Sequence, residues 1–335
     1  MLKLGLIGAG RIGKVHCDTV MTRVQDATIV SVADYYEESA KSLAAQYGIS
    51  HATSNHRDIL ENSDVDAVII ASSTDTHSQF IIESAQAGKD IFCEKPIDFN
   101  LARIDEAIKA VADAGVKFQV AFQRRFDATF LRVKQAIDNG EVGTPHLLHI
   151  ISRDPAPPPI TYIKVSGGLF FDMTIHDFDM ARFLLGEVEE VYAMSANLVD
   201  PAIGEAGDID TAIITLKFAN GAMGTIDNSR KAVYGYDQRV EVFGDKGSVT
   251  NANQYPDTVT LNTGDSVRRG SLPLNFFLER YAAAYQFELE AFVDCVVNDK
   301  PVSVGGADGR APVVIAMACY KSLKEKRPVK LSEIS

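Results

Sequence analysis

The sequence has no excess of positive charge and no long apolar segment, and each absence excludes a class of protein. The net charge is -12 because 45 acidic residues outnumber 33 basic ones. That balance disfavours nucleic acid or an anionic membrane as a partner. No apolar run is long enough to span a bilayer. The N-terminus begins with a strand pattern instead of the basic and apolar regions of a signal peptide. We therefore expect a cytoplasmic protein.

Cysteine is also scarce and is not arranged for metal binding or for disulfides. The four cysteines are Cys17, Cys93, Cys295 and Cys319, and no two form a CxxC pair. They lie in apolar stretches, which favours reduced core thiols of a cytosolic protein. We predict no metal site.

The chain of 335 residues, 46% hydrophobic and 23% charged, has the composition of a globular protein with room for two domains. Up to residue 122, strand and helix patterns alternate, which is typical of a doubly wound parallel sheet. Beyond residue 123, a helix and then consecutive strands with hairpin signals favour a mostly antiparallel sheet. The sequence thus predicts an α/β Rossmann domain over 1–122 and an α+β substrate-binding and oligomerisation domain over 123–335.

A glycine-rich turn follows the first predicted strand and opens a helical pattern. This GxGxxG motif spans 8–13 and has the context that dinucleotide binding requires. Its glycines allow a tight turn and close approach of the backbone to a pyrophosphate, whose charge the helix N-terminus favours. The residues predicted to contact the cofactor here are Gly8, Gly10, Arg11, Ile12 and Gly13.

The second predicted strand ends on Asp34, about 20 residues beyond the turn. A carboxylate there suits hydrogen bonding to a ribose hydroxyl and repels a 2′-phosphate. Tyr35 and Tyr36 follow, so no arginine is present to hold such a phosphate. The pattern therefore predicts NAD and not NADP. The alternative is a Rossmann-like domain that binds no nucleotide.

Polar residues follow two further strands, at the sheet edge where ligands of such folds bind. Lys95 can donate to a substrate oxygen and to the cofactor ribose, and the neighbouring motifs favour this over the alternative of a solvated lysine before a proline turn. His77 can equally be a residue at the start of a helix without a functional role. We expect that it takes no part in catalysis. The cofactor-contacting residues predicted at these ends are Ser72, Ser73, Thr74, His77, Glu94 and Lys95.

The segment 167–179 carries the residues best suited to acid–base chemistry. Asp172, His176 and Asp179 follow two glycines at i, i+4 and i+7, which share one face of a helix. The other positions are apolar, and buried charge is costly without a partner. We therefore expect this face to line a cleft, with His176 as general base and a carboxylate orienting its ring. The alternative is a core histidine near an acidic helix start.

These motifs together resemble the glucose–fructose oxidoreductase, inositol dehydrogenase and rhizopine-catabolism family over essentially the whole chain. The resemblance rests on the glycine turn, Asp34, the Glu94-Lys95-Pro96 triplet and the helix with Asp172 and His176. Segments 124–127, 172–182 and 232–244 are similar to the inositol-oxidising branch. The resemblance implies NAD-dependent oxidation of the axial 2-hydroxyl of myo-inositol to scyllo-inosose. It also implies a catalytic set of Lys95, Asp172 and His176 and a homotetramer packed through open sheet faces.

A polyol has hydroxyls on every side, so further polar groups are expected to bind it. Each of these can equally be structural. The predicted substrate-binding residues are Lys95, Arg125, Asp154, Asp172, His176, Asp179, Tyr234 and Tyr236. Two other functions stay open: a dehydrogenase of the same fold acting on another cyclic polyol or an aldose, and a cofactor-bound sensor without turnover. A sensor need not keep Lys95, Asp172 and His176.

Overall fold

The first part of the chain forms a parallel sheet of six strands in the order β3-β2-β1-β4-β5-β6. This is the strand order of a doubly wound dinucleotide-binding fold, and it confirms the predicted class. The strands read as near-continuous apolar runs because helices cover both faces of such sheets. The strands are β1 (Leu2–Ile7), β2 (Ala27–Ala33), β3 (His51–Thr53), β4 (Ala67–Ile70), β5 (Asp90–Glu94) and β6 (Phe118–Ala121).

Helices connect these strands, and glycine or asparagine marks several of their ends. Gly48 and Gly115 adopt left-handed conformations at the ends of α2 and α5, where a Cβ would be strained. The Asn100 side chain accepts from the first backbone N–H groups of α5, which satisfies donors that lack intrahelical partners. The helices are α1 (Arg11–Thr22), α2 (Glu37–Tyr47), α3 (His56–Leu60), α4 (Thr74–Gln86) and α5 (Leu101–Ala114).

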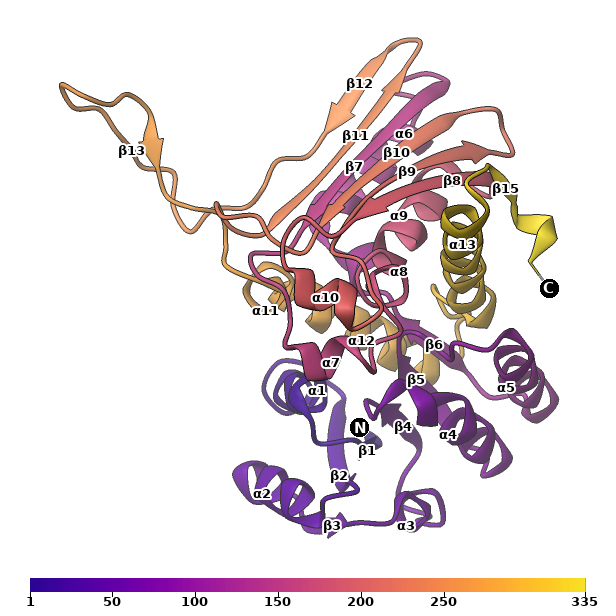
Figure 1. The fold of residues 1–335 in the computed structure, drawn as a ribbon. Helices are drawn as coiled ribbons and strands as arrows, with labels where there is room; N and C mark the ends of the chain where they lie inside the picture. The colour runs from indigo at the N-terminus through magenta and orange to yellow at the C-terminus, as the bar shows by residue number, and fades with distance from the viewer. Residues whose placement is uncertain (335) are drawn as a thin grey trace. The chain divides into compact units, whose positions relative to one another are not determined.

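The computed structural model describes residues 1–334 and divides the chain into two compact units, drawn in Figure 1. The first contains residues 1–126 and 283–313, and the second contains 127–282 and the residues from 314. Leu289, Phe292 and Val293 of α12 (Ala282–Val297) pack in one core with Phe92 of β5. The domain boundary predicted between residues 122 and 123 remains a prediction. Helix α12, far along the chain, completes the core of the first unit.

The second unit is built on a sheet of seven strands in the order β12-β11-β7-β10-β9-β8-β15. The β7–β10 pair is parallel and the other pairs are antiparallel, which confirms the mostly antiparallel prediction. The strands are β7 (Pro145–Arg153), β8 (Val188–Ala196), β9 (Thr211–Phe218), β10 (Met223–Ser229), β11 (Asp237–Gly244), β12 (Gly247–Thr250) and β15 (Val329–Lys330).

Alternation along these strands gives the sheet one buried and one exposed face. In β9, Ala212, Ile214 and Leu216 are buried while Ile213 is exposed, as the two-residue period of a strand requires. The helices of this unit are α6 (Ala128–Asp138), α7 (Ile160–Ile163), α8 (Leu169–Asp172), α9 (Ile175–Leu185), α10 (Pro201–Glu205), α11 (Phe277–Arg280) and most of α13 (Gly306–Glu325). A short hairpin, β13 (Thr260–Leu261) and β14 (Arg269–Gly270), lies on an arm that extends from the sheet (Figure 1).

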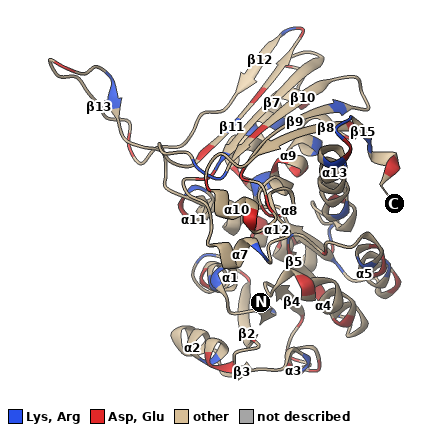
Figure 2. Ribbon diagram, in the orientation of Figure 1, with Lys and Arg blue, Asp and Glu red and all other residues tan. Residues whose placement is uncertain are grey.

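Figure 2 shows acidic and basic residues interspersed along the helices, without a long run of one sign. Among residues 1–334, no helix has both the length and the apolarity needed to cross a bilayer. Within the same range, no group of three or more His, Cys, Asp or Glu side chains is arranged to hold a metal ion.

Candidate functional site

The glycine turn between β1 and α1 is shaped for close backbone approach. Gly8 has a φ of 106°, and a Cβ there would lie 2.5 Å from the carbonyl of Ala71. A Cβ on Gly13 would lie 1.9 Å from the carbonyl oxygen of Gly8. Gly10, by contrast, faces open space at the N-cap of α1. The turn thus packs tightly on one side and leaves the N-terminus of α1 accessible, with Arg11 exposed beside it. Such an N-terminus favours a phosphate group.

Asp34 lies at the end of β2 and contacts this turn directly. Its Oδ2 accepts a hydrogen bond of 2.7 Å from the Ala9 N–H, and its Oδ1 accepts one of 2.9 Å from the Tyr36 N–H. These bonds fix the carboxylate beside the glycine turn, where a ribose hydroxyl would be bound. Tyr35, next to it, is 87% exposed and lies edge-on against the Tyr36 ring.

The loops after β4 and β5 are joined through His77. This ring is buried, and its Nδ1 and Nε2 lie 2.8 Å from the Pro96 carbonyl oxygen and 3.2 Å from the Ser72 carbonyl oxygen. Burial lowers the pKa of His77, because desolvation disfavours the charged ring. His77 therefore lies between two strand-end loops, and as a neutral ring it can donate to only one of the two carbonyl oxygens. Ser73 and Thr74 begin α4 beside it.

Glu94, at the end of β5, contacts a buried histidine that no sequence motif indicates. His16 of α1 is fully buried, and its Nε2 lies 2.7 Å from Glu94 Oε1. The other Glu94 oxygen accepts a bond of 3.3 Å from the Lys95 backbone N–H. The side chain of Lys95 is half-buried. Glu94 thus links α1 to the strand end that carries Lys95. No local sequence pattern predicts this link.

Asp172 and His176 lie on separate helices in the second unit, so the single continuous helix expected over this segment was wrong. Helix α8 ends at Asp172, and α9 begins at Ile175. Thr174 lies between them, and its hydroxyl donates to Asn228 Oδ1 at 2.6 Å. His176 and Asp179 remain on one face of α9, but Asp179 is buried and His176 is half-buried.

The Asp172 carboxylate is held by two side chains from elsewhere in the unit. Its Oδ1 accepts a hydrogen bond of 2.9 Å from the Tyr162 hydroxyl of α7. Its Oδ2 accepts one of 3.1 Å from a guanidinium nitrogen of Arg230, which follows β10. Arg230 is fully buried and also donates to Asp208 at 3.3 Å. Burial lowers the pKa of Arg230, but the charges of Asp172 and Asp208 outweigh this and raise it.

The remaining predicted substrate residues have diverse surroundings. Arg125, in the first unit, donates to Asp308 at 3.0 Å. The backbone of Asp154 pairs with Ser229 and Ala232, and its charge contributes to the raised pKa of Arg230.

The two predicted tyrosines differ in exposure. Tyr234 is 39% exposed; its hydroxyl donates to Asp237 at 2.6 Å and accepts from Arg153 at 2.9 Å. Tyr236 is buried edge-on against Phe276 and Tyr281. Of the predicted substrate residues in the second unit, Asp172 bonds to Arg230 and the charge of Asp154 acts on it.

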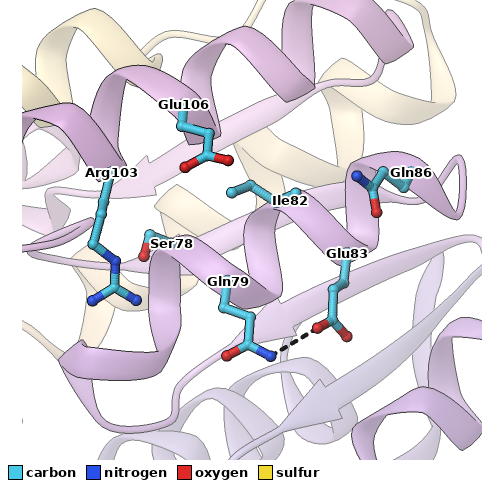
Figure 3. A pocket seen from close by; sticks show the side chains of 7 residues that line it. All are labelled: Ser78, Gln79, Ile82, Glu83, Gln86, Arg103 and Glu106. Carbon is cyan, nitrogen blue, oxygen red and sulfur yellow. Dashed lines mark hydrogen bonds between the residues drawn. The ribbon is translucent and has the colours of Figure 1, made fainter.

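An open groove in the first unit lies between α4 and α5 (Figure 3). Figure 3 shows charged and amide side chains around it, with Gln79 bonded to Glu83. The lining residues are Ser78, Gln79, Ile82, Glu83, Gln86, Arg103 and Glu106. None of them belongs to the predicted site, and a doubly wound fold binds its ligands at the strand ends instead.

Comparisons with known proteins agree with the fold and with the motifs. Residues 2–122 match the model of an oxidoreductase family with an NAD-binding Rossmann fold, and residues 130–250 match the GFO/IDH/MocA C-terminal domain. The chain belongs to the GFO/IDH/MocA oxidoreductase family. It is 48% identical over 334 residues to myo-inositol 2-dehydrogenase of Thermotoga maritima, with 99% of both chains covered. It is 46% identical over 332 residues to inositol 2-dehydrogenase of Rhizobium meliloti, again with 99% of both covered.

Among solved structures, scyllo-inositol dehydrogenase of Lactobacillus casei, with bound NAD(H) and scyllo-inositol, superposes with a TM-score of 0.93. Its sequence is 29% identical, and 99% of each chain is covered. The GFO/IDH/MocA assignment confirms the family resemblance, the Rossmann fold and NAD as the cofactor.

The residues of the first unit fit NAD. The glycine turn leaves backbone N–H groups accessible at the start of α1, a helix of 12 residues. The Asp34 carboxylate is held beside the turn by backbone donors, where it can accept from ribose hydroxyls. When bound, NAD supplies the hydride acceptor, while Gly8, Gly10, Gly13 and Asp34 are the residues we expect to hold it.

Three buried residues were missed by sequence reasoning: His16, Arg230 and Glu288. His16 lies 78 positions from Glu94, and Arg230 lies 58 positions from Asp172 and 22 from Asp208. The Glu288 carboxyl has no hydrogen-bond partner among residues 1–334. No local spacing could therefore reveal these residues. For Arg230, one signal existed: a lone arginine directly after a strand, close in sequence to the tyrosines selected as site residues.

Proposed function

We propose that this enzyme oxidises myo-inositol at its axial 2-hydroxyl to scyllo-inosose, with NAD as the hydride acceptor. The observation that carries the proposal is the 48% identity to a myo-inositol 2-dehydrogenase over 99% of both chains, together with Lys95, Asp172 and His176 in this sequence.

The chemistry requires one C–H bond and one O–H bond of the substrate to break. The hydride leaves the carbinol carbon, and the hydroxyl proton goes to His176 as general base. Asp172 stabilises the imidazolium that forms, as a carboxylate does beside other catalytic histidines. The ammonium of Lys95 stabilises negative charge as it develops on the substrate oxygen.

The remaining predicted residues would hold the ring hydroxyls. Asp154 and Asp179 can accept hydrogen bonds, Arg125 can donate them, and Tyr234 and Tyr236 can do both. Which ring epimer is preferred depends on how these groups surround the substrate. We also propose a cytoplasmic homotetramer, supported by the apolar residues on the exposed sheet face of the second unit.

A second candidate function is oxidation of scyllo-inositol or of another cyclic polyol or aldose. It is favoured by the similarity to the scyllo-inositol dehydrogenase of Lactobacillus casei. The two substrates differ in the orientation of a single hydroxyl, so the same catalytic set would serve both.

The test is NADH production from a panel of inositol isomers and aldoses, with the product identified by its reduction back to an inositol. The proposal predicts the highest kcat/KM for myo-inositol. A higher value for scyllo-inositol would establish the second candidate, and no turnover of any polyol would contradict both.

A further inference from the structure

Arg230 is the largest fully buried side chain of the second unit and carries a charge. Its exposed fraction is 0%, and its guanidinium bonds to Asp172 at 3.1 Å and to Asp208 at 3.3 Å. A buried guanidinium is costly unless carboxylates compensate it. Two carboxylates against one cation leave an excess of one negative charge in this cluster, and such a charge favours an imidazolium nearby.

Helix α8 cannot by itself fix the Asp172 side chain. It contains only four residues, and a helix of one turn is not stable without tertiary contacts. Asp172 is its last residue, directly before the break at Met173. The orientation of the carboxylate therefore depends on its side-chain partners, Arg230 and the Tyr162 hydroxyl.

Arg230 itself is fixed at both of its ends. Its backbone N–H donates to the Asp210 carbonyl oxygen at 2.8 Å, and its guanidinium reaches Asp208. Asp208 in turn accepts from the Leu169 N–H, the first residue of α8, at 2.9 Å. Arg230 thus bridges the two ends of α8, through Asp208 at the start and through Asp172 at the end.

We propose that Arg230 is a positioning residue that holds the Asp172 carboxylate in the orientation used for catalysis. This inference rests on the proposed function, in which Asp172 supports the imidazolium of His176. Arg230 acts through Asp172, and its loss removes the buried guanidinium that holds this carboxylate in place.

The first test is a double-mutant cycle on turnover. Arg230→Met should lower kcat by about 10- to 100-fold, the usual effect of losing a partner that orients a site residue, while NAD affinity stays unchanged. In an Asp172→Asn background the same substitution should lower kcat by less than about threefold, because residues acting as one unit are not additive. Equal losses in the two backgrounds would overturn the proposal.

Two further variants separate positioning from general structural damage. Arg230→Lys should recover part of the lost turnover, since an ammonium keeps the charge but cannot form the same fork. If Arg230→Met does not fold, the cycle is run with Arg230→Lys. Arg182→Met is the matched control, because it removes an Arg–carboxylate pair on α9 that includes no candidate site residue. A similar drop in kcat for Arg182→Met would contradict a specific role for Arg230.

A second readout needs no substrate. The pKa of His176 is measured by NMR titration of labelled histidine in the four proteins of the cycle. Arg230→Met removes a cation and should raise this pKa in Asp172→Asn. The rise should be smaller, or become a fall, when Asp172 is present, because the carboxylate is then no longer held where it stabilises the imidazolium. The same shift in both backgrounds would exclude action through Asp172. If the wild type oxidises no inositol but this difference is found, the proposed function fails and the Arg230–Asp172 coupling stands.

Discussion

His176 is the residue on which the proposed chemistry depends most directly. We predict that His176→Ala lowers kcat by a factor on the order of 10²–10⁴, the usual contribution of a positioned base. In the wild type, kcat/KM should rise with pH as the imidazole loses its proton, and this rise should disappear in the variant. The measurement is a pH profile of kcat/KM for both proteins, with NAD binding as the control for folding. A variant that keeps near wild-type turnover and the same rise would make His176 a core histidine.

Asp34 should determine the choice between NAD and NADP. Asp34→Ala combined with Tyr35→Arg removes a repulsive charge and adds a phosphate partner, so the ratio of kcat/KM for NADP to that for NAD should increase at least about tenfold. Activity with NAD should fall as well, because the Asp34 carboxylate also accepts from the Ala9 N–H of the glycine turn. If the ratio of kcat/KM for NADP to that for NAD, measured with one substrate, is unchanged, Asp34 does not determine the choice of cofactor.

Glu288 should make the protein less stable as the pH rises. It is fully buried on α12, and neither carboxyl oxygen has a hydrogen-bond partner among residues 1–334. Burial first, and then the charge of Glu94, raises its pKa well above the usual value. The unfolded chain ionises near its ordinary pKa, so above that pH the folded state binds more protons and loses stability, until the pH passes the folded pKa.

Glu288→Gln removes this ionisation and should stabilise the fold at neutral pH. The gain over wild type should be small near pH 4 and should grow by up to about 1.4 kcal/mol per pH unit above the unfolded pKa. Urea unfolding at several pH values measures it, and Glu290→Gln on the same helix is the control. Parallel pH dependences for wild type and Glu288→Gln would mean that Glu288 is ionised in the folded protein.

At the scale of elements, a single carboxylate both begins α6 and holds α11. Asp127 Oδ1 accepts from the Thr129 and Phe130 N–H groups, at 3.1 and 3.3 Å. Both of its oxygens also pair with the buried guanidinium of Arg280, at 2.6 and 3.1 Å. The helix predicted from residue 124 therefore begins later, at Ala128, because Asp127 serves as its N-cap.

We predict that Asp127→Ala lowers the free energy of unfolding by about 3–5 kcal/mol, because it leaves a buried charge without its partner. Asp127→Asn should cost less, since the amide oxygen still caps α6. Asp200→Ala is the matched control: Asp200 caps α10 through the Ala202 N–H, and loss of a cap alone costs about 1 kcal/mol. Equal costs in urea unfolding for the two alanine variants would show that the Arg280 pair contributes nothing.

At the scale of the whole molecule, the proposed tetramer depends on the exposed face of the seven-stranded sheet. Met194, Ile213 and Met223 are between 56% and 60% exposed on this face, and Met194 pairs directly with Ile213. Such a set of apolar side chains is characteristic of an interaction surface. The wild type should therefore sediment as a tetramer at micromolar concentration.

Ile213→Lys should shift the protein toward smaller species, since a buried lysine without a partner opposes association. Sedimentation equilibrium measures this, and Val297→Lys, at an exposed apolar position of the first unit, is the control. A wild type that sediments as a monomer would show that this face is not an interface.

The sequence by itself determined the features that local spacing encodes. The alternation of apolar strands with helices specified the parallel sheet, and hairpin signals specified the second sheet, because side-chain periodicity reports which face is buried. The glycine turn and Asp34 indicated NAD, since both lie within one strand–helix–strand unit. The family could be recognised from Glu94-Lys95-Pro96 and from Asp172 and His176. The proposed chemistry requires these residue types, and their spacing is visible in the sequence.

Only the tertiary structure decided how these groups are held. Helix α12 joins the core of the first unit although it lies far along the chain. The segment with Asp172 and His176 divides into α8 and α9, and Thr174 between them bonds to Asn228 of β10. Arg230, His16 and Glu288 acquire their roles from residues distant in sequence. The physical reason is that burial and charge pairing depend on which elements pack against one another. The periodicity of side chains within a single helix or strand does not specify those packing partners.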